Sequence, residues 1–136
     1  MQMTPDKKKN KLYIVVPCYN EEQVLGETSK RLKIKCENLI QKGQISKDSK
    51  IVFVDDGSKD RTWKMISELH ETDSLFSGVK LSRNRGHQNA LLAGLTMASE
   101  HADMAISMDA DLQDDINAVD QMIEKYYEGC DIVYGV

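Results

Sequence analysis

Long apolar runs are missing from the sequence: none approaches the ~20 residues needed to span a bilayer, and there is no N-terminal signal peptide. We therefore expect a soluble chain, although it could belong to a longer protein attached to a membrane. The three cysteines form no C-x-x-C pair and are odd in number, which favours reduced thiols in a cytosolic setting over a disulfide framework. The net charge of −4 gives no electrostatic footprint for nucleic acid.

Sequence motifs of several common enzyme classes are also missing. There is no Walker motif, no GxGxxG and no Ser/His/Asp arrangement, so P-loop, dinucleotide-binding and hydrolase interpretations lose their usual support. At 136 residues, 40% of them hydrophobic, the chain is long enough for one domain with a substantial core. We assign that domain to residues 12–136 and interpret residues 1–11 as a solvated basic tail.

The sequence does contain a regular alternation of β-rich apolar runs with helical patterns. We predict strands at residues 12–16, 51–54, 79–81, 104–107 and 131–134. We predict helices at about residues 20–42, 60–70, 86–100 and 116–126. This order predicts an α/β fold with a mostly parallel sheet and helices on both faces.

Several boundaries of these elements follow from local chemistry. Pro17 is expected to stop the first strand, because proline disfavours continued strand pairing. Asn20 is a plausible N-cap of the first helix, and Gly43 fits its end. The third helix is expected to bury a stripe made of Leu91, Leu95 and Ala98.

The most informative stretch is Met108-Asp-Ala-Asp-Leu-Gln-Asp114, which follows the predicted strand 104–107. Asp109, Asp111 and Gln113 alternate with other residues, so their side chains lie on one face of an extended chain and can converge at the strand's end. Such oxygen ligands suit a hard cation, Mg²⁺ or Mn²⁺, that keeps open positions for phosphate oxygens. An isolated Asp-x-Asp is usually only a polar loop. Its place after an apolar strand favours a metal site here.

The other unusual residues also lie in loops that follow predicted strands. These loops are residues 17–21, 55–58, 82–88 and 109–114. Right-handed crossovers bring them all to the carboxyl edge of the sheet, where ligands bind at the point of strand-order reversal. Each loop also has an ordinary interpretation, as a capped helix start, a turn or a solvated connection.

Two of these loops carry candidate binding groups. Asp56, in an open loop, could accept hydrogen bonds from a nucleobase edge while Gly57 lets the backbone come close. Alternatively, the segment could be only a turn. Arg83 and Arg85 precede a predicted helix start. Arginines and helix N-termini both bind phosphate, so these two are candidate phosphate-binding residues, with a solvated loop as the equal alternative.

Four segments stand in a recognisable order along the chain. They are Val16-Pro-Cys-Tyr-Asn-Glu21, Val54-Asp-Asp-Gly-Ser58 with Asp60-Arg-Thr62, Leu81-Ser-Arg-Asn84 and Asp109-Ala-Asp-Leu-Gln-Asp114. Together they resemble the catalytic domain of family 2 (GT-A) glycosyltransferases, over about residues 12–135. More narrowly, the chain resembles polyprenyl-phosphate sugar transferases, namely bactoprenol glucosyltransferases and dolichol-phosphate mannose synthases. The resemblance implies a Rossmann-like GT-A nucleotide-diphospho-sugar transferase fold.

The resemblance also implies roles for individual residues. The nucleoside of the sugar donor would be held by Pro17, Tyr19, Glu21, Val54 and Asp56. Asp109, Ala110 and Asp111 would face the ribose and the diphosphate, and Asp109 and Asp111 would be the catalytic residues. Asp111 and Gln113 would ligate Mg²⁺ or Mn²⁺.

The implied reaction is the attack of a lipid phosphate on the anomeric carbon of a UDP- or GDP-sugar. The metal would offset charge developing on the leaving nucleoside diphosphate. The implied partners are therefore the sugar donor and a membrane lipid phosphate, and the full-length protein would work at the cytoplasmic face of the membrane.

Two departures from the family pattern affect these expectations. Asp115-Ile116 stands where the family usually has prolines, so the start of the fourth helix is less defined. The sequence stops at Val136, before the acceptor-side and membrane segments of the family. We therefore expect the donor-binding part of a longer enzyme, inactive by itself. Alternatives are a family 2 transferase acting on polysaccharide or cell-wall acceptors, a nucleotide-binding module without activity and, more weakly, a nucleotidyltransferase.

Overall fold

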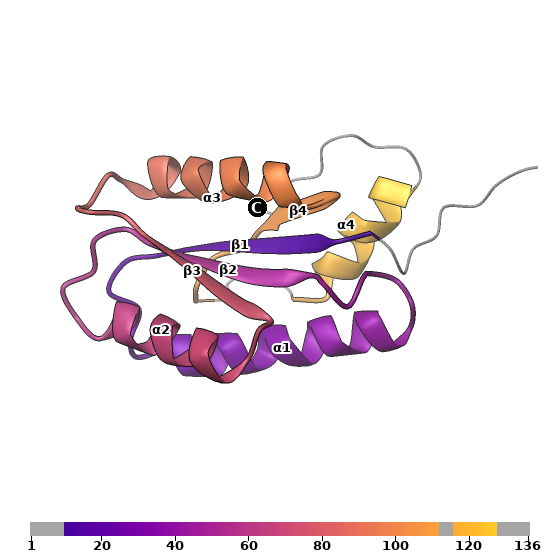
Figure 1. Ribbon diagram of the computed structural model, residues 1–136, viewed down its shortest axis with the longest axis horizontal. Coiled ribbons are helices and arrows are strands. Elements are labelled where there is room, and N and C mark those ends of the chain that lie inside the picture. Colours follow the sequence, from indigo (N-terminus) through magenta and orange to yellow (C-terminus); the bar gives the residue numbers. More distant parts are fainter. Residues whose placement is uncertain (1–9, 112–115, 128–136) are drawn as a thin grey trace, which may run out of the picture.

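The computed structural model describes residues 10–111 and 116–127 of the chain (Figure 1). Its elements are β1 (Leu12–Cys18), α1 (Leu25–Gln41), β2 (Lys50–Asp55), α2 (Thr62–Thr72), β3 (Phe76–Lys80), α3 (His87–His101), β4 (Met104–Ser107) and α4 (Ala118–Tyr127). The predicted alternation of strands and helices is confirmed over these ranges. The strand predicted at 131–134 and most of the basic tail lie outside the described residues. No helix within the described ranges is long and apolar enough to cross a membrane.

The four strands form one parallel sheet in the order β3-β2-β1-β4. The chain moves outward from β1 to β3 and then returns through α3 to place β4 on the other side of β1. Strand order therefore reverses between β1 and β4. Because all strands run in the same direction, their carboxyl ends share one edge of the sheet, as predicted.

Helices cover both faces of this sheet (Figure 1). In that view α3 lies above the sheet, and α1 and α2 lie below it. The larger core is on the α1 side, where Phe53 stacks on Phe76 with ring centroids 6.0 Å apart. α4 joins this core through Val119 and Ile123. Each such buried apolar side chain contributes roughly 1.5–3 kcal/mol to folding, so the α1 side contains most of the hydrophobic stabilisation.

The contact between α3 and the sheet uses small residues. The fully buried positions of the helix are Ala90, Gly94 and Ala98. A Cβ atom on Gly94 would come within 2.4 Å of Val15 and 2.8 Å of Val54. Leu91 and Leu95 flank this contact and are only partly buried. The predicted stripe therefore does pack against the sheet, but its leucines lie at the margin of the contact, because the close approach of the helix selects for small side chains at the centre.

The end of β1 also differs from the prediction, since Pro17 does not stop the strand. Pairing with β4 ends at Val15, whereas pairing with β2 continues to Cys18. The Cys18 carbonyl accepts a hydrogen bond from Asp56 on the β2 side. Strand alternation therefore turns the nitrogen of Pro17 toward the side that β4 has left, where a missing N–H removes no ladder bond.

The first helix begins at Leu25 and is not capped by Asn20. Asn20 lies in the preceding turn with a positive φ of 53°. The end of the helix matches the prediction: Gly43 has a φ of 71°, and the N–H of Gln44 bonds to the carbonyl of Leu39 in a Schellman motif.

Candidate functional site

A pocket of about 330 Å³ opens at the carboxyl edge of the sheet. It includes the ends of β1 and β4, between which strand order reverses, the position at which open α/β sheets bind ligands. Residues from all four loops that follow the strands line it: Pro17, Cys18, Tyr19, Glu21, Asp56, Asn84, Gly86, His87, Ala90, Asp109, Ala110 and Asp111. The structure thus brings the four predicted loops to one site.

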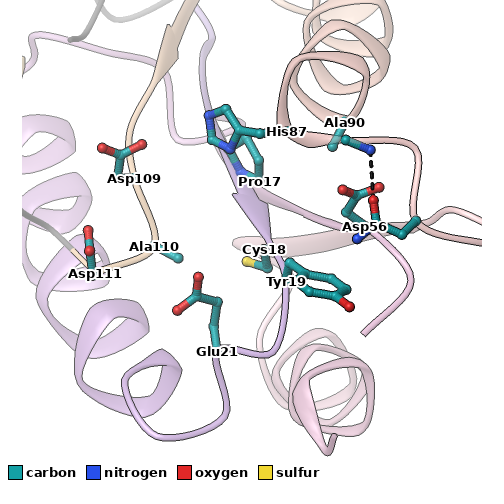
Figure 2. A pocket seen from close by; sticks show the side chains of 12 residues that line it. Pro17, Cys18, Tyr19, Glu21, Asp56, His87, Ala90, Asp109, Ala110 and Asp111 are labelled. Carbon is teal, nitrogen blue, oxygen red and sulfur yellow. Dashed lines mark hydrogen bonds between the residues drawn. The ribbon is translucent and has the colours of Figure 1, made fainter. Parts of the chain in front are cut away.

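Figure 2 shows that acidic side chains lie on opposite sides of this pocket. Asp109 and Asp111 lie on one side and Asp56 on the other, with Pro17 and His87 between them. This spread gives the pocket room for an elongated polar ligand that meets a different carboxylate at each end.

The end of β1 contributes an exposed aromatic ring and a buried thiol. Tyr19 is 41% exposed and presents its ring to the pocket. Cys18 is buried, and its Sγ donates to the carbonyl of Val16 at 3.4 Å. Burial, with smaller contributions from nearby carboxylates, raises the pKa of the Cys18 thiol well above its usual range. The thiol is therefore neutral and unsuited to nucleophilic chemistry.

Asp56 is held in place rather than lying in an open loop, so that expectation was wrong. It is only 3% exposed, and its Oδ1 accepts a hydrogen bond of 2.7 Å from the backbone N–H of Arg85. The next residue, Gly57, has a φ of 75° and packs so closely that a Cβ would lie 2.5 Å from the backbone nitrogen of Asn84. The turn after β2 and the loop after β3 are therefore built against each other.

The segment after β4 forms the acidic side of the pocket. Ala110 is buried, and its carbonyl accepts a hydrogen bond from the hydroxyl of Thr28 in α1, which anchors the backbone between Asp109 and Asp111. Burial raises the pKa of the Glu21 carboxyl, followed by the charge of Asp111 and then by those of Asp60 and Asp109. Carboxylates therefore repel one another on this side of the pocket, and a cation would relieve that repulsion.

The start of α3 brings residues to the pocket that the sequence analysis did not single out. Gly86 precedes the helix with a φ of 92°, and His87 is its first residue. Both line the pocket, together with Asn84 and Ala90. The sequence signal for them is a glycine at a helix start that follows a strand, Gly86-His87 after β3.

Some predicted site residues lie elsewhere. Val54 is fully buried beneath α3 and does not line the pocket, and its side chain supports the helix. Its role in holding the nucleoside therefore stays a prediction. Arg83 and Arg85 are exposed and lie outside the lining, so their phosphate-binding role stays a prediction. Gln113 lies outside the described residues, so its role as a metal ligand also stays a prediction.

The carboxylates of the pocket fit Mg²⁺ or Mn²⁺ provided that water and substrate phosphates complete the coordination shell of the cation. In the part of the chain that the structure describes, no group of three His, Cys, Asp or Glu side chains could hold a metal ion. Mg²⁺ commonly uses only one or two protein carboxylates and completes its shell with water and substrate phosphates. Asp109 and Asp111 supply such carboxylates, so they suit a cation that also contacts a diphosphate.

Sequence comparison finds relatives among glycosyltransferases. The chain is 54% identical over 125 residues to the uncharacterized glycosyltransferase YkoT of Bacillus subtilis (strain 168), which covers 92% of this chain and 37% of that protein. It is 36% identical over 132 residues to the undecaprenyl-phosphate 4-deoxy-4-formamido-L-arabinose transferase of Enterobacter sp. (strain 638), which covers 96% of this chain and 38% of that protein. The chain spans less than two fifths of the length of these relatives.

Solved structures share the fold. TarS 1-349 of S. aureus, in complex with UDP-GlcNAc, matches with a TM-score of 0.61 at 20% identity, over 86% of this chain and 32% of that one. The mannosyltransferase PcManGT of Pyrobaculum calidifontis, in complex with GDP-Man and Mn²⁺, matches with a TM-score of 0.57 at 25% identity, over 76% of this chain and 28% of that one. These neighbours confirm the predicted GT-A glycosyltransferase fold.

The family assignment covers almost the whole chain. The sequence profile described as Glycosyl transferase family 2 matches residues 13–136, which include the four segments that carried the resemblance. The chain belongs to glycosyl transferase family 2.

Proposed function

We propose that this chain binds a nucleotide-diphosphate sugar and that the full-length protein transfers the sugar to a polyprenyl phosphate. One observation carries the proposal: a single pocket joins Asp56, which suits a nucleobase edge, to Asp109 and Asp111, which suit a cation-bound diphosphate. The similarity to an undecaprenyl-phosphate sugar transferase supports a lipid phosphate as acceptor.

The nucleoside would lie on the Asp56 side of the pocket. A buried carboxylate there can accept hydrogen bonds from base N–H groups, and such bonds discriminate well because a mismatched base leaves buried polar groups unpaired. Tyr19 offers a partly exposed aromatic ring on the same side, and Pro17 offers an apolar surface. The arrangement supports recognition of the base by shape and by hydrogen bonds.

The diphosphate would lie on the side of Asp109 and Asp111. Without a cation, it would meet the negative charges of these residues and of Glu21, so we expect its binding to require Mg²⁺ or Mn²⁺. When bound, the cation supplies charge stabilisation for the leaving diphosphate. Gly86 and His87, at the N-terminus of α3, also line the pocket, so the positive end of this helix faces it.

The acceptor phosphate would require little activation by the protein. A lipid phosphate is already anionic near neutral pH, so the reaction does not depend on a strong general base. What the protein must provide is alignment of the phosphate oxygen with the anomeric carbon. A lipid acceptor also places the full-length protein at a membrane, and we propose its cytoplasmic face.

Calorimetry with UDP and GDP tests the donor site. We expect at least one of them to bind in Mg²⁺ or Mn²⁺, and to bind far more weakly in chelator or after Asp111→Asn. The cation alone should bind weakly, because the protein supplies only part of its shell. Asp120→Asn is the matched control, since Asp120 lies on α4 in an ion pair with Lys35, outside the pocket. Equal affinity with and without chelator would contradict the metal assignment.

Transfer assays test the acceptor. The chain and the longer protein would each be incubated with labelled UDP-glucose or GDP-mannose, the cation and polyprenyl phosphate in detergent. Lipid-linked sugar from the longer protein supports the proposal. Labelling of polysaccharide in place of lipid would support the alternative acceptor, and nucleotide binding without any transfer would support a binding module.

A further inference from the structure

The loop between β1 and α1, which presents Tyr19 and Glu21 to the pocket, is held by residues that do not line the pocket. Three successive backbone N–H groups of this loop donate to side chains of the segment that joins β2 to α2 and of the first residue of α2. The bonds run from Asn20 to Ser58 Oγ at 2.8 Å, from Glu21 to Thr62 Oγ1 at 2.8 Å and from Glu22 to Asp60 Oδ2 at 3.3 Å. Such a series ties one loop to the other along its length.

Asp60 and Thr62 also fix each other. The Thr62 hydroxyl donates to Asp60 Oδ1 at 2.5 Å, and the Thr62 backbone N–H donates to the same oxygen at 2.9 Å. The hydroxyl donates its only hydrogen to Asp60. Its oxygen is therefore oriented to accept a hydrogen bond from the backbone N–H of Glu21. Thr62 is fully buried, so water cannot easily replace this acceptor.

The direction of the Glu21 side chain is set from both sides of its α-carbon. Its N–H is held by Thr62, and its carbonyl accepts the N–H of Leu25 at 2.9 Å, the bond with which α1 begins. One residue earlier, Asn20 keeps its positive φ of 53° while its side-chain oxygen accepts the N–H of Lys59 at 2.8 Å. Tyr19 therefore directly precedes a residue whose backbone and side chain are both held by the segment after β2.

We propose that Asp60 and Thr62 are positioning residues for nucleotide binding: they hold the loop 19–22 so that Tyr19 and Glu21 face the ligand, without touching it themselves. The inference rests on the proposed function of the pocket. If the loop adopts its binding geometry for only a fraction of the time, the apparent dissociation constant rises by the inverse of that fraction.

Thr62→Val is the sharpest variant. It keeps the shape of the side chain and the backbone bond to Asp60 that begins α2, and it removes the hydroxyl that accepts from Glu21 and donates to Asp60. Thr62→Ser retains that hydroxyl and should rescue the function. Asp60 variants are less informative, because Asp60 also accepts the first N–H of α2 and its loss would disturb the helix directly.

The experiment measures dissociation constants for UDP and GDP in Mn²⁺, well below the melting temperature of every variant. We expect Thr62→Val to weaken the tighter nucleotide about tenfold and Thr62→Ser to stay within about twofold of the parent. Ile66→Val is the matched control for stability, because Ile66 is buried in the same helix but does not line the pocket. It should lower the melting temperature and leave the dissociation constant unchanged.

The outcomes separate this inference from the proposed function. If the parent chain binds neither nucleotide, the proposed function fails and the inference fails with it. If the parent binds and Thr62→Val binds equally well, only the inference is overturned. A loss of affinity in Ile66→Val as large as that in Thr62→Val would show a general effect of stability, and it would also overturn the inference.

If the Thr62→Val chain does not fold, two further measurements on another variant test the same loop. Ser58→Ala removes the acceptor for Asn20 at an exposed site, and we expect about two- to threefold weaker binding. Amide hydrogen exchange should show faster exchange at Asn20 in that variant than in the parent. Unchanged affinity and unchanged exchange in Ser58→Ala would contradict a loop held by these bonds.

Discussion

Asp56 and Arg85 are joined by a hydrogen bond of 2.7 Å, from the backbone N–H of Arg85 to the carboxylate Oδ1 of Asp56. The bond connects the turn after β2 to the loop that leads into α3. Because Asp56 also lines the pocket, one side chain both orders a loop and faces the candidate site. Substitution can separate its contribution to stability from its proposed contribution to binding.

Asp56→Ala leaves the Arg85 N–H without its acceptor. We expect the free energy of unfolding to fall by about 1–3 kcal/mol and nucleotide binding to weaken as well. Asp56→Asn retains an oxygen for Arg85, so it should retain most of the stability while still weakening the binding of a base that donates N–H groups. Urea denaturation and calorimetry on both variants measure the two effects.

Arg85→Ala is the control for this pair, since it removes the guanidinium and keeps the backbone N–H. Its free energy of unfolding should stay within about 0.5 kcal/mol of the parent. A selective loss of diphosphate affinity in this variant would support the predicted phosphate-binding role of Arg85. A destabilisation as large as that of Asp56→Ala would contradict the importance of the backbone bond.

Gly57→Ala should be more harmful than Gly86→Ala. Both residues have a positive φ, 75° and 92°, so alanine is strained at each, by roughly 1–3 kcal/mol. At Gly57 the new Cβ would also lie 2.5 Å from the backbone of Asn84, whereas at Gly86 nothing lies within 4 Å. Melting temperatures of the two variants give the comparison, and equal shifts would argue against the close packing of the two loops.

Gly94→Ala and Gly26→Ala should shift stability in opposite directions. At Gly94 a Cβ would press on Val15 and Val54 at the buried face of α3, and we expect a loss of about 1–3 kcal/mol. At Gly26, in the first turn of α1, a Cβ meets nothing within 4 Å, and alanine should stabilise the helix by about 0.5–1 kcal/mol. Denaturant unfolding checks the signs; destabilisation by both would mean that α1 cannot accept the added methyl group.

Glu21 predicts a pH dependence of stability. Its carboxyl has a pKa raised above the ordinary value of 4.5 by burial and by Asp111, so the folded state disfavours its charged form. The protonated carboxyl therefore stabilises the fold below pH 4.5 relative to the charged one, and this advantage is lost as pH rises through the folded pKa. Glu21→Gln should raise the melting temperature relative to the parent near pH 7 and lose that gain near pH 4. A difference that does not change with pH would contradict the raised pKa.

The sequence by itself determined the order and type of the elements, the edge of the sheet that carries the site, and the family. Apolar runs such as residues 12–16 and 104–107 predict buried strands from local sequence alone. The turn residues that follow them indicate where the strands end. The topology rules for parallel sheets then bring the loops of Tyr19, Asp56 and Asp109 together without any further information.

Only the tertiary structure decided how closely elements approach and which partner each polar group takes. Periodicity marks Leu91 and Leu95 as apolar, but the short distance from α3 to the sheet buries Gly94 instead. Asn20 has the side chain of a helix cap, yet its partner is Lys59 in another loop. Hydrogen-bond partners and interelement distances arise when separate segments pack, so local sequence cannot specify them.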